Sequence, residues 1–544
     1  MDFKYTGKRE YANHAQRSTV MVPGAAVATS HPLASMAGLR ALEKGGNAVD
    51  AAVTAAAVLS VVEPYSVGLG GDAFAMIYMA SANRVFGMNG SGRSPAKISI
   101  ENLISNGFKQ VPERGALSIT VPGALMGWYD AVSKFGRLKF SQCLEDAIFY
   151  AENGFPVTEV ISGEWADANE VLKDSPELRR VFFTSGRSPY PGERFRNPDL
   201  ARTLRIISND GIEAFYRGEI GEKIEKTVIS QGGYLSVEDL ALHKTDWVEP
   251  VTGTYRGYKV MELPPNGQGI IALELLNLLE GYGIASMGHN SPDYLHLLIE
   301  GKKLTFADRN FYISDPEKIK VPVEELLSRK HADYLRSLIN MSNAMEERQG
   351  PSYVVPNSET VYITAMDEER NAVSFISSLF MHFGSGVVPE GIGFALQNRG
   401  HSFSLDPYQP NHLAPGKRPM HTIIPAMLFK DDMFLMNFGV MGGDMQVQGH
   451  AQFLANIIDF GMNLQEAMDA PRVRHVYGKE VYFEDGIPEE TIKELEKRGH
   501  QHYIPPKTEQ GNQVGGGQAI YLDSENDVLF AASDRRKDGC AVGR

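Results

Sequence analysis

Residues 51–62 constrain the fold most, because they form an Ala- and Val-rich run that is apolar on every side of a helix. A helix of this kind is stable only when other parts of the protein surround it. Asn47 precedes the run as a suitable N-cap, and Asp50 lies near the positive end of the helix dipole. A second apolar run begins at Pro32, which suits the first turn of a helix, and stops at Gly45. We therefore predict two adjacent buried helices packed as a layer on a sheet.

The composition is that of a large globular protein with an acidic surface. Of 544 residues, 43% are hydrophobic, and 67 acidic against 53 basic residues give a net charge of −14. Such a chain repels nucleic-acid phosphates and anionic lipid surfaces. The one dense basic cluster, Arg535–Lys537, is flanked by aspartates, and we interpret it as a solvated turn. We expect neither a nucleic-acid partner nor a membrane partner.

The ends of the chain and its cysteines exclude further classes. The first ten residues carry charges but no apolar core of a signal peptide, and no stretch has the apolar length of a membrane helix. A cytoplasmic, soluble protein is the default expectation, although a signal peptide removed beforehand would leave the same pattern. Cys143 and Cys540 cannot build a disulfide framework. The histidines lack the spacing of a zinc motif such as H-E-x-x-H.

The second half of the chain begins with a change of pattern. Residues 342–356 are polar and turn-rich, which predicts a flexible segment. Residues 360–364 and 373–380 then read as two strands joined by an acidic turn, and 434–440 read as a third strand. An amphipathic helix follows Gly442 and Gly443.

Two glycine-rich turns are candidates for binding an anion. Residues 68–73 fit the dinucleotide pattern G-x-G-x-x-A, but they follow a helix and precede a strand, the reverse of what a pyrophosphate site needs. Gly442 and Gly443 lie between a strand and a helix, where backbone N–H groups can point at developing negative charge. A plain strand-to-helix turn would explain the same pair. The residues alone therefore predict a large α/β protein with one candidate anion site.

Several motifs occur in a fixed order along nearly the whole chain. They are His31–Ser35, Gly45–Ala52, Gly68–Gly71, Val121–Gly123, Gly253–Tyr258, Asp534–Arg536 and Asp538–Gly539. This ordered set closely resembles the γ-glutamyltransferase family. The resemblance implies the N-terminal-nucleophile hydrolase fold, an α+β four-layer αββα sandwich formed by one interlocked unit.

The resemblance also gives Thr360 a role. In the family, the threonine at the cleavage site is followed by a short strand ending in Asp, a turn and Asn-Ala-Val, which match Asp367 and 371–373 here. The Thr360 hydroxyl would attack the carbonyl of Glu359, giving an ester that water opens. The products would be a large fragment, 1–359, and a small fragment, 360–544. The freed α-amine titrates at about 7.7–8.0, so it can act as a base for its own hydroxyl near neutral pH.

The remaining catalytic groups follow from the same resemblance. The family has a threonine where this chain has Ser378, and we assign this hydroxyl to positioning and activating Thr360. Gly442 and Gly443 match the glycines of the family's oxyanion hole. Because one residue supplies both nucleophile and base, the sequence implies no metal and no organic cofactor.

The chain departs from the family at the pocket for the glutamate amino-acid group. Ser91 replaces the usual arginine, with Arg93 two residues later, while Phe380 and Ser402 take the places of the asparagine and the amine-binding aspartate. The candidate substrate-binding residues are Ser91, Arg93, Asn398, Arg399, His421 and Thr422. Without the aspartate, a substrate ammonium lacks its partner, whereas the added arginines favour an anion. In this respect the chain resembles the oxamate amidohydrolase branch.

Two functional hypotheses follow. The first is a self-processing amide hydrolase or acyltransferase that cleaves γ-glutamyl compounds or small carboxylate amides, with the two fragments as partners and a homo-oligomer allowed. The second is an unprocessed, catalytically silent homologue that binds a small anion. In either case Arg93 or Arg399 could simply pair with a carboxylate of the protein.

Overall fold

The computed structural model describes residues 17–171, 173, 175–346, 358–506 and 512–544. Most of the segment predicted to be flexible, 342–356, and the first ten residues therefore lie outside the described residues. No helix within these ranges is both long enough and apolar enough to cross a membrane.

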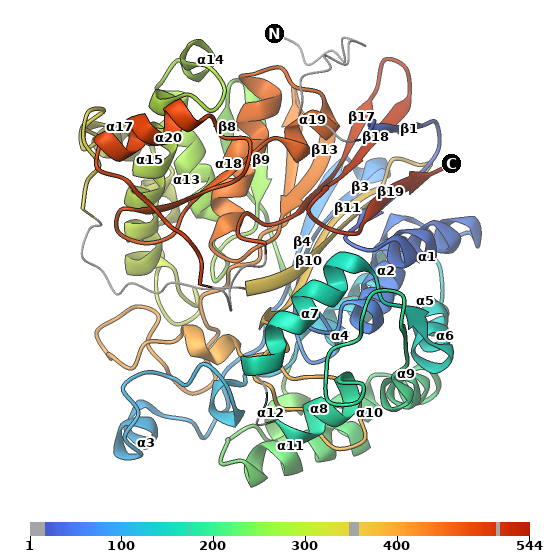
Figure 1. The fold of residues 1–544 in the computed structure, drawn as a ribbon. Helices are drawn as coiled ribbons and strands as arrows, with labels where there is room; N and C mark the ends of the chain where they lie inside the picture. The colour runs from blue at the N-terminus through green and yellow to red at the C-terminus, as the bar shows by residue number, and fades with distance from the viewer. Residues whose placement is uncertain (1–16, 172, 174, 347–357, 507–511) are drawn as a thin grey trace.

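Two seven-stranded antiparallel sheets form the centre of the molecule (Figure 1). The first sheet has the order β1 (Val20–Val22), β18 (Val528–Ser533), β17 (Gly517–Asp523), β13 (Met433–Val440), β12 (Ala426–Lys430), β9 (Tyr258–Glu262) and β8 (Val251–Tyr255). The second sheet has the order β19 (Cys540–Gly543), β2 (Ala26–Thr29), β10 (Ser358–Met366), β11 (Ala372–Met381), β3 (Asp72–Met79), β4 (Arg84–Gly90) and β7 (Asp246–Val248). Both sheets thus combine strands from before and after residue 360.

Helices cover the outer face of each sheet. Those over the second sheet are α1 (Pro32–Glu43), α2 (Ala48–Val62), α4 (Ala124–Phe135), α5 (Phe140–Cys143), α6 (Glu145–Asn153), α7 (Glu159–Val171), α8 (Pro176–Phe182), α9 (Pro198–Asp210), α10 (Glu213–Tyr216) and α11 (Glu219–Ser230). Those over the first sheet are α13 (Gly269–Glu280), α14 (Ile284–Met287), α15 (Pro292–Tyr312), α16 (Val323–Leu326), α17 (Arg329–Ser337), α18 (Met445–Ile458), α19 (Leu464–Asp469) and α20 (Glu489–Lys497).

The smaller elements are α3 (Ile100–Ser105), α12 (Val237–Ala241), the strand pair β5 (Phe155–Pro156) and β6 (Arg194–Phe195), and the three-stranded sheet of β14 (Val473–His475), β15 (Glu480–Phe483) and β16 (Gln501–His502).

Three apolar cores separate the four layers. One core lies between the second sheet and the helical layer that includes α1 and α2. Another lies between the first sheet and the layer that includes α13, α15 and α18. The third lies between the sheets, where Phe74 and Tyr362 of the second sheet meet Met427 and Ile520 of the first. The predicted αββα sandwich is confirmed.

The helix that the sequence analysis started from is buried as expected. All fifteen residues of α2 are buried, and the helix contacts β10 and β11. Asn47 caps its first turn in a capping box with Asp50. The N–H of Ala48 donates to Asp367 Oδ2 at 3.0 Å, so the buried helix is tied to the end of β10, the strand that contains Thr360.

The prediction of a solvated turn at Arg535–Lys537 is wrong. Lys537 is buried, and its Nζ donates to both oxygens of Glu164 at 2.6 and 2.8 Å. The Arg536 side chain is 6% exposed and pairs with Glu484 and Asp534. Arg536 and Lys537 can be buried because Glu484 and Glu164, from distant parts of the chain, neutralise them, which the local sequence does not reveal.

Candidate functional site

Thr360 lies at an irregular position of the β10–β11 ladder. Glu359 pairs with Phe380, whereas Val361 pairs with Ser377, so the register shifts at Thr360. Irregularities of this kind redirect a side chain out of the regular alternation. The Thr360 hydroxyl donates to Ser378 Oγ at 3.2 Å, and both residues are buried. The structure therefore brings together the two hydroxyls that the sequence analysis paired.

The C-terminal end of β11 is held in a conformation that few residues adopt. Phe380 has a φ of 81°, and its N–H donates to Ser378 Oγ at 2.8 Å. Asn398 Oδ1 accepts from the N–H of Met381 at 3.2 Å, and Asn398 Nδ2 donates to the carbonyl of Glu113 at 2.8 Å. Asn398 thus supports the end of β11 beside Ser378, and its contact with a substrate stays a prediction.

A histidine–aspartate pair lies next to the two hydroxyls. Asp72 is the residue opposite Ser378 in the ladder between β3 and β11, and its Oδ2 lies 3.0 Å from His421 Nε2. Burial, followed by the charge of Arg399, lowers the pKa of His421 to about 4, so the ring is neutral at pH 7. With the Nε2 proton donated to Asp72, Nδ1 is an acceptor, and it has no hydrogen-bond partner among the described residues.

Sequence reasoning missed Asp72. Its signal was the position directly after the glycine turn 68–71, which served as a dinucleotide pattern and as a motif of the family resemblance but gave the aspartate no role. The structure shows instead that a Cβ on Gly71 would lie 2.6 Å from the carbonyl oxygen of Ser378. The glycine is needed because the turn passes close to the strand that carries Ser378.

Arg399 brings a positive charge to the same region. It is fully buried, its Nη1 donates to Thr422 Oγ1 at 2.9 Å, and its guanidinium lies 4.0 Å from the centre of the Phe380 ring. Ser402, at the family's amine-binding position, donates its hydroxyl to the carbonyls of Arg399 and Met420 at 2.9 and 3.2 Å. This region therefore combines a buried guanidinium with a neutral hydroxyl at Ser402.

Gly442 and Gly443 connect β13 to α18 with φ values of 111° and 56°. The carbonyl of Gly443 accepts from Gln268 Nε2 at 3.1 Å, and this amide also donates to the carbonyl of Thr422 at 2.8 Å. Arg309 Nη1 donates in turn to Gln268 Oε1 at 3.0 Å and to Asp444 Oδ1 at 2.5 Å. The network fixes the orientation of the glycine peptides, which an oxyanion hole requires. Sequence reasoning missed Gln268 and Arg309, because their contacts join segments far apart in the chain.

Arg93 and Ser91 make contacts that differ from those of Arg399. The guanidinium of Arg93 lies 3.2 Å from Asp315 and 2.8 Å from Glu317, so two carboxylates already neutralise it. The Ser91 hydroxyl donates to Asn89 Oδ1 at 2.7 Å and accepts from Asn266 Nδ2 at 3.2 Å. Substrate binding by this pair stays a prediction.

A cavity of about 800 Å³ borders this network. Arg309, Ser402 and Met420 line it on the side of the site, and its other walls mix apolar and polar groups. They include Ile104, Phe108, Lys109, Glu113, Ile313, His401, Phe403 and Leu405. The cavity is large enough for an organic group of drug-like size.

The family model described as Gamma-glutamyltranspeptidase matches residues 34–544. The chain belongs to this family. The gamma-glutamyltranspeptidase assignment confirms the N-terminal-nucleophile hydrolase fold, with autocatalytic processing of a proenzyme as the family's character.

Relatives within the family carry different names. A glutathione hydrolase-like proenzyme of Bacillus subtilis is 37% identical over 523 residues, covering 95% of this chain and 98% of that protein. The oxamate amidohydrolase proenzyme of Klebsiella pneumoniae is 34% identical over 537 residues, covering 97% and 99%. The structure of cephalosporin acylase from Bacillus halodurans matches with a TM-score of 0.91 at 41% identity and covers 98% of both chains. Membership in the gamma-glutamyltranspeptidase family therefore leaves the substrate open.

Ser378→Ala should slow amide hydrolysis by about 10²-fold, because the hydroxyl that orients Thr360 Oγ1 is lost. The measurement is kcat on processed protein, together with the half-time of self-cleavage. Ser378→Thr keeps the hydroxyl and should retain most of the rate. Equal rates in Ser378→Ala and wild type would refute the positioning role.

The buried histidines make stability depend on pH. Burial is the main cause that lowers the pKa of His243, His382 and His421 to about 4 each. In the unfolded chain they titrate near 6.5, so their contribution is complete above that pH and is lost as pH falls towards 4. As pH falls from 6.5 to 5, each of these three histidines should lower the free energy of unfolding by about 2 kcal/mol. The thermal midpoint should therefore drop steeply over this window, and less steeply in His243→Gln. A midpoint that stays flat would contradict these assignments.

Proposed function

We propose that the chain cuts itself before Thr360 and that Thr360 then hydrolyses amides whose acyl group carries a carboxylate. The buried Arg399 guanidinium beside Thr422 and Phe380 carries this proposal. A second support is Ser402, which puts a hydroxyl bonded to backbone carbonyls where a γ-glutamyl pocket needs a carboxylate. The relatives named oxamate amidohydrolase and cephalosporin acylase agree with an acid-amide substrate.

Self-cleavage exchanges an amide for an ester and then opens it. The Thr360 oxygen attacks the carbonyl carbon of Glu359, and the C–N bond between the two residues breaks while the amide nitrogen takes up the hydroxyl proton. Water then hydrolyses the ester, leaving a carboxylate on Glu359 and a free α-amine on Thr360. The hydrogen bond from Thr360 to Ser378 holds the hydroxyl at the position where the strand register is irregular.

Turnover uses the new amine as the base. The α-amine of Thr360 accepts the hydroxyl proton as the oxygen attacks the substrate amide, and the N–H groups of Gly442 and Gly443 stabilise the oxyanion. The protonated amine passes its proton to the leaving amine when the C–N bond breaks. Water finally hydrolyses the threonyl ester and releases the acid. The neutral His421, held by Asp72, offers its Nδ1 to a donor on the substrate.

The cavity indicates the size and polarity of the leaving group. Ammonia or an amino acid would not require about 800 Å³ with Phe108, Ile313 and Leu405 in its walls. We therefore propose a bulky, partly apolar amine as the leaving group. In this reading the carboxylate of the acyl group contacts Arg399 while the amine occupies the cavity.

One pair of chromogenic substrates tests the proposal directly. Glutaryl-p-nitroanilide and γ-glutamyl-p-nitroanilide have the same leaving group and the same terminal carboxylate, and they differ only in the α-amino group beside that carboxylate. We expect kcat/KM to favour the glutaryl compound by at least about tenfold, since the site offers the ammonium no carboxylate at Ser402. Preference for the γ-glutamyl compound would overturn the substrate class, and turnover of neither by a cleaved chain would exclude acyl groups of this length.

A further inference from the structure

Two clusters of histidine and carboxylate side chains lie among the helices over the first sheet. One consists of Glu274, Asp308 and His331; the other consists of His296, Glu300 and His500. In each, the potential ligand atoms lie within 4.8 Å of one another. Neither belongs to the site around Thr360, and the two differ in charge balance and in access to solvent.

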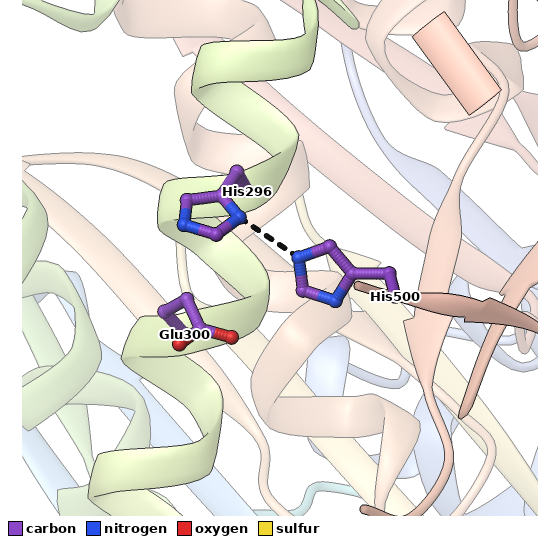
Figure 2. Close-up of side chains that lie close together, drawn as sticks. All are labelled: His296, Glu300 and His500. Carbon is purple, nitrogen blue, oxygen red and sulfur yellow. Dashed lines mark hydrogen bonds between the residues drawn. The ribbon is translucent and has the colours of Figure 1, made fainter. Parts of the chain in front are cut away.

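Among the described residues, every potential ligand atom of the cluster in Figure 2 except His500 Nδ1 already has a partner in the protein. His296 Nδ1 lies 2.8 Å from His500 Nε2, and His296 Nε2 lies 2.9 Å from the carbonyl of Asn340. The two oxygens of Glu300 accept from Lys303 Nζ at 2.8 Å and from the N–H of Met345 at 2.9 Å. A divalent cation here would meet the buried ammonium of Lys303 and would have to break these bonds. This cluster fastens the chain at 340–345 to α15.

The other cluster has more acidic than basic side chains. Glu274 of α13, Asp308 of α15 and His331 of α17 bring two carboxylates to one imidazole. His331 Nε2 lies 2.7 Å from Asp308 Oδ2 and 3.1 Å from Glu274 Oε1. The Glu274 side chain is fully buried, and its Oε2 has no hydrogen-bond partner among the described residues. A buried carboxyl group with an unused oxygen is costly in its charged form unless a cation accompanies it.

We propose that Glu274, Asp308 and His331 bind one divalent transition-metal ion, with Zn²⁺ as the expected ion. One imidazole nitrogen and two carboxylates are ligands that Zn²⁺ accepts, and the Irving–Williams order favours it over Mn²⁺.

The geometry fits an ion with little rearrangement. Zinc–nitrogen and zinc–oxygen bonds of about 2.0–2.2 Å at tetrahedral angles separate ligand atoms by roughly 3.3 Å. The distances from His331 Nε2, 2.7 and 3.1 Å, need to grow by only a few tenths of an ångström. The side chains of Asp308 and His331 are 17% and 18% exposed, so an ion and its water ligands can enter from solvent.

The ion would connect α13, α15 and α17, which lie apart in the sequence. Asp308 directly precedes Arg309, whose guanidinium holds Gln268 and Asp444 beside the glycine turn. Fixing α15 at Asp308 therefore stabilises the helix that supports this network. The proposed ion acts on stability and takes no part in amide hydrolysis, so the proposal stands independently of the function of Thr360.

Titration calorimetry with ZnCl₂ on tag-free, EDTA-treated protein tests the site. We expect one equivalent bound per chain, a thermal midpoint raised by at least about 2 °C at a 100-fold excess over Kd, and a visible d–d spectrum with Co²⁺ as a substitute. Asp308→Asn and His331→Ala should each abolish stoichiometric binding. His500→Asn, in the other cluster, is the matched control and should leave it intact.

The same experiment can overturn the proposal. Wild-type protein that binds no Zn²⁺ stoichiometrically would refute it without any variant, so a misfolded variant cannot rescue it. Undiminished binding in a folded His331→Ala protein would place the ion elsewhere. Loss of binding in a folded His500→Asn protein, with retention in His331→Ala, would assign the ion to the cluster of Figure 2.

Discussion

Thr360→Ala should yield a single chain of 544 residues that hydrolyses no amide. The variant lacks the hydroxyl that attacks Glu359 and, without cleavage, never gains the α-amine that serves as base. Loss of a nucleophile of this kind lowers kcat by at least about 10⁴-fold. Wild-type protein should instead give fragments of 359 and 185 residues (544 − 359 = 185), the smaller beginning Thr-Val-Tyr-Ile. Denaturing electrophoresis, intact mass and N-terminal sequencing measure all of this.

Thr360→Ser is the matched control, because it keeps both the hydroxyl and the amine. It should be cleaved and active, with slower rates. Three results would each reject a different part of the proposal. Cleavage of the alanine variant would show that another residue cuts the chain, and hydrolysis by it would show another nucleophile. A wild-type chain that stays whole and inactive would favour the silent, anion-binding homologue.

Arg399→Met should lower kcat/KM for glutaryl-p-nitroanilide by about 10²–10³-fold while leaving self-cleavage intact. The substitution removes a buried cation that we expect to meet the substrate carboxylate, and breaking such a pair typically costs about 3–5 kcal/mol. Self-cleavage acts on the Glu359 carbonyl and needs no carboxylate of a substrate. Steady-state kinetics on cleaved protein, with the thermal midpoint as a check on folding, gives the answer. Most of the loss should appear in KM.

Arg93→Met provides the comparison. Because Asp315 and Glu317 already neutralise Arg93, its removal should reduce kcat/KM much less, by under about fivefold. The ratio between the two variants separates a specific contact from a general loss of positive charge. If Arg93→Met proves the more damaging, the substrate carboxylate lies at the Ser91–Arg93 end of the site.

Local sequence patterns predicted the parts of the fold that depend on neighbours in the chain. The capped α2, the strands β10 and β11 and the helix after the glycine pair all appear where periodicity and capping placed them. The pairing of Thr360 with Ser378 was implied by the family resemblance, and the structure shows the two hydroxyls, eighteen residues apart, in contact across β10 and β11.

Contacts between distant segments were beyond such patterns. Asp72 meets His421 across 349 residues, and Lys537 meets Glu164 across 373, so no local signal could pair them. The sequence likewise showed two candidate cations, Arg93 and Arg399, with no indication of their contacts. The ion pairs of Arg93 with Asp315 and Glu317 span more than 200 residues and have no local signal.

The interleaving of strands has a consequence for the lifetime of the enzyme. In the second sheet β10 lies between β2 and β11, so strands from both sides of residue 360 are hydrogen-bonded neighbours. After a cut before Thr360, neither piece alone retains a complete sheet. After thermal unfolding, the two polypeptides would have to reassociate in a bimolecular step. The newly synthesised precursor folds as one chain and needs no such step. The working enzyme would then persist by the slowness of its unfolding, and each molecule would fold only once.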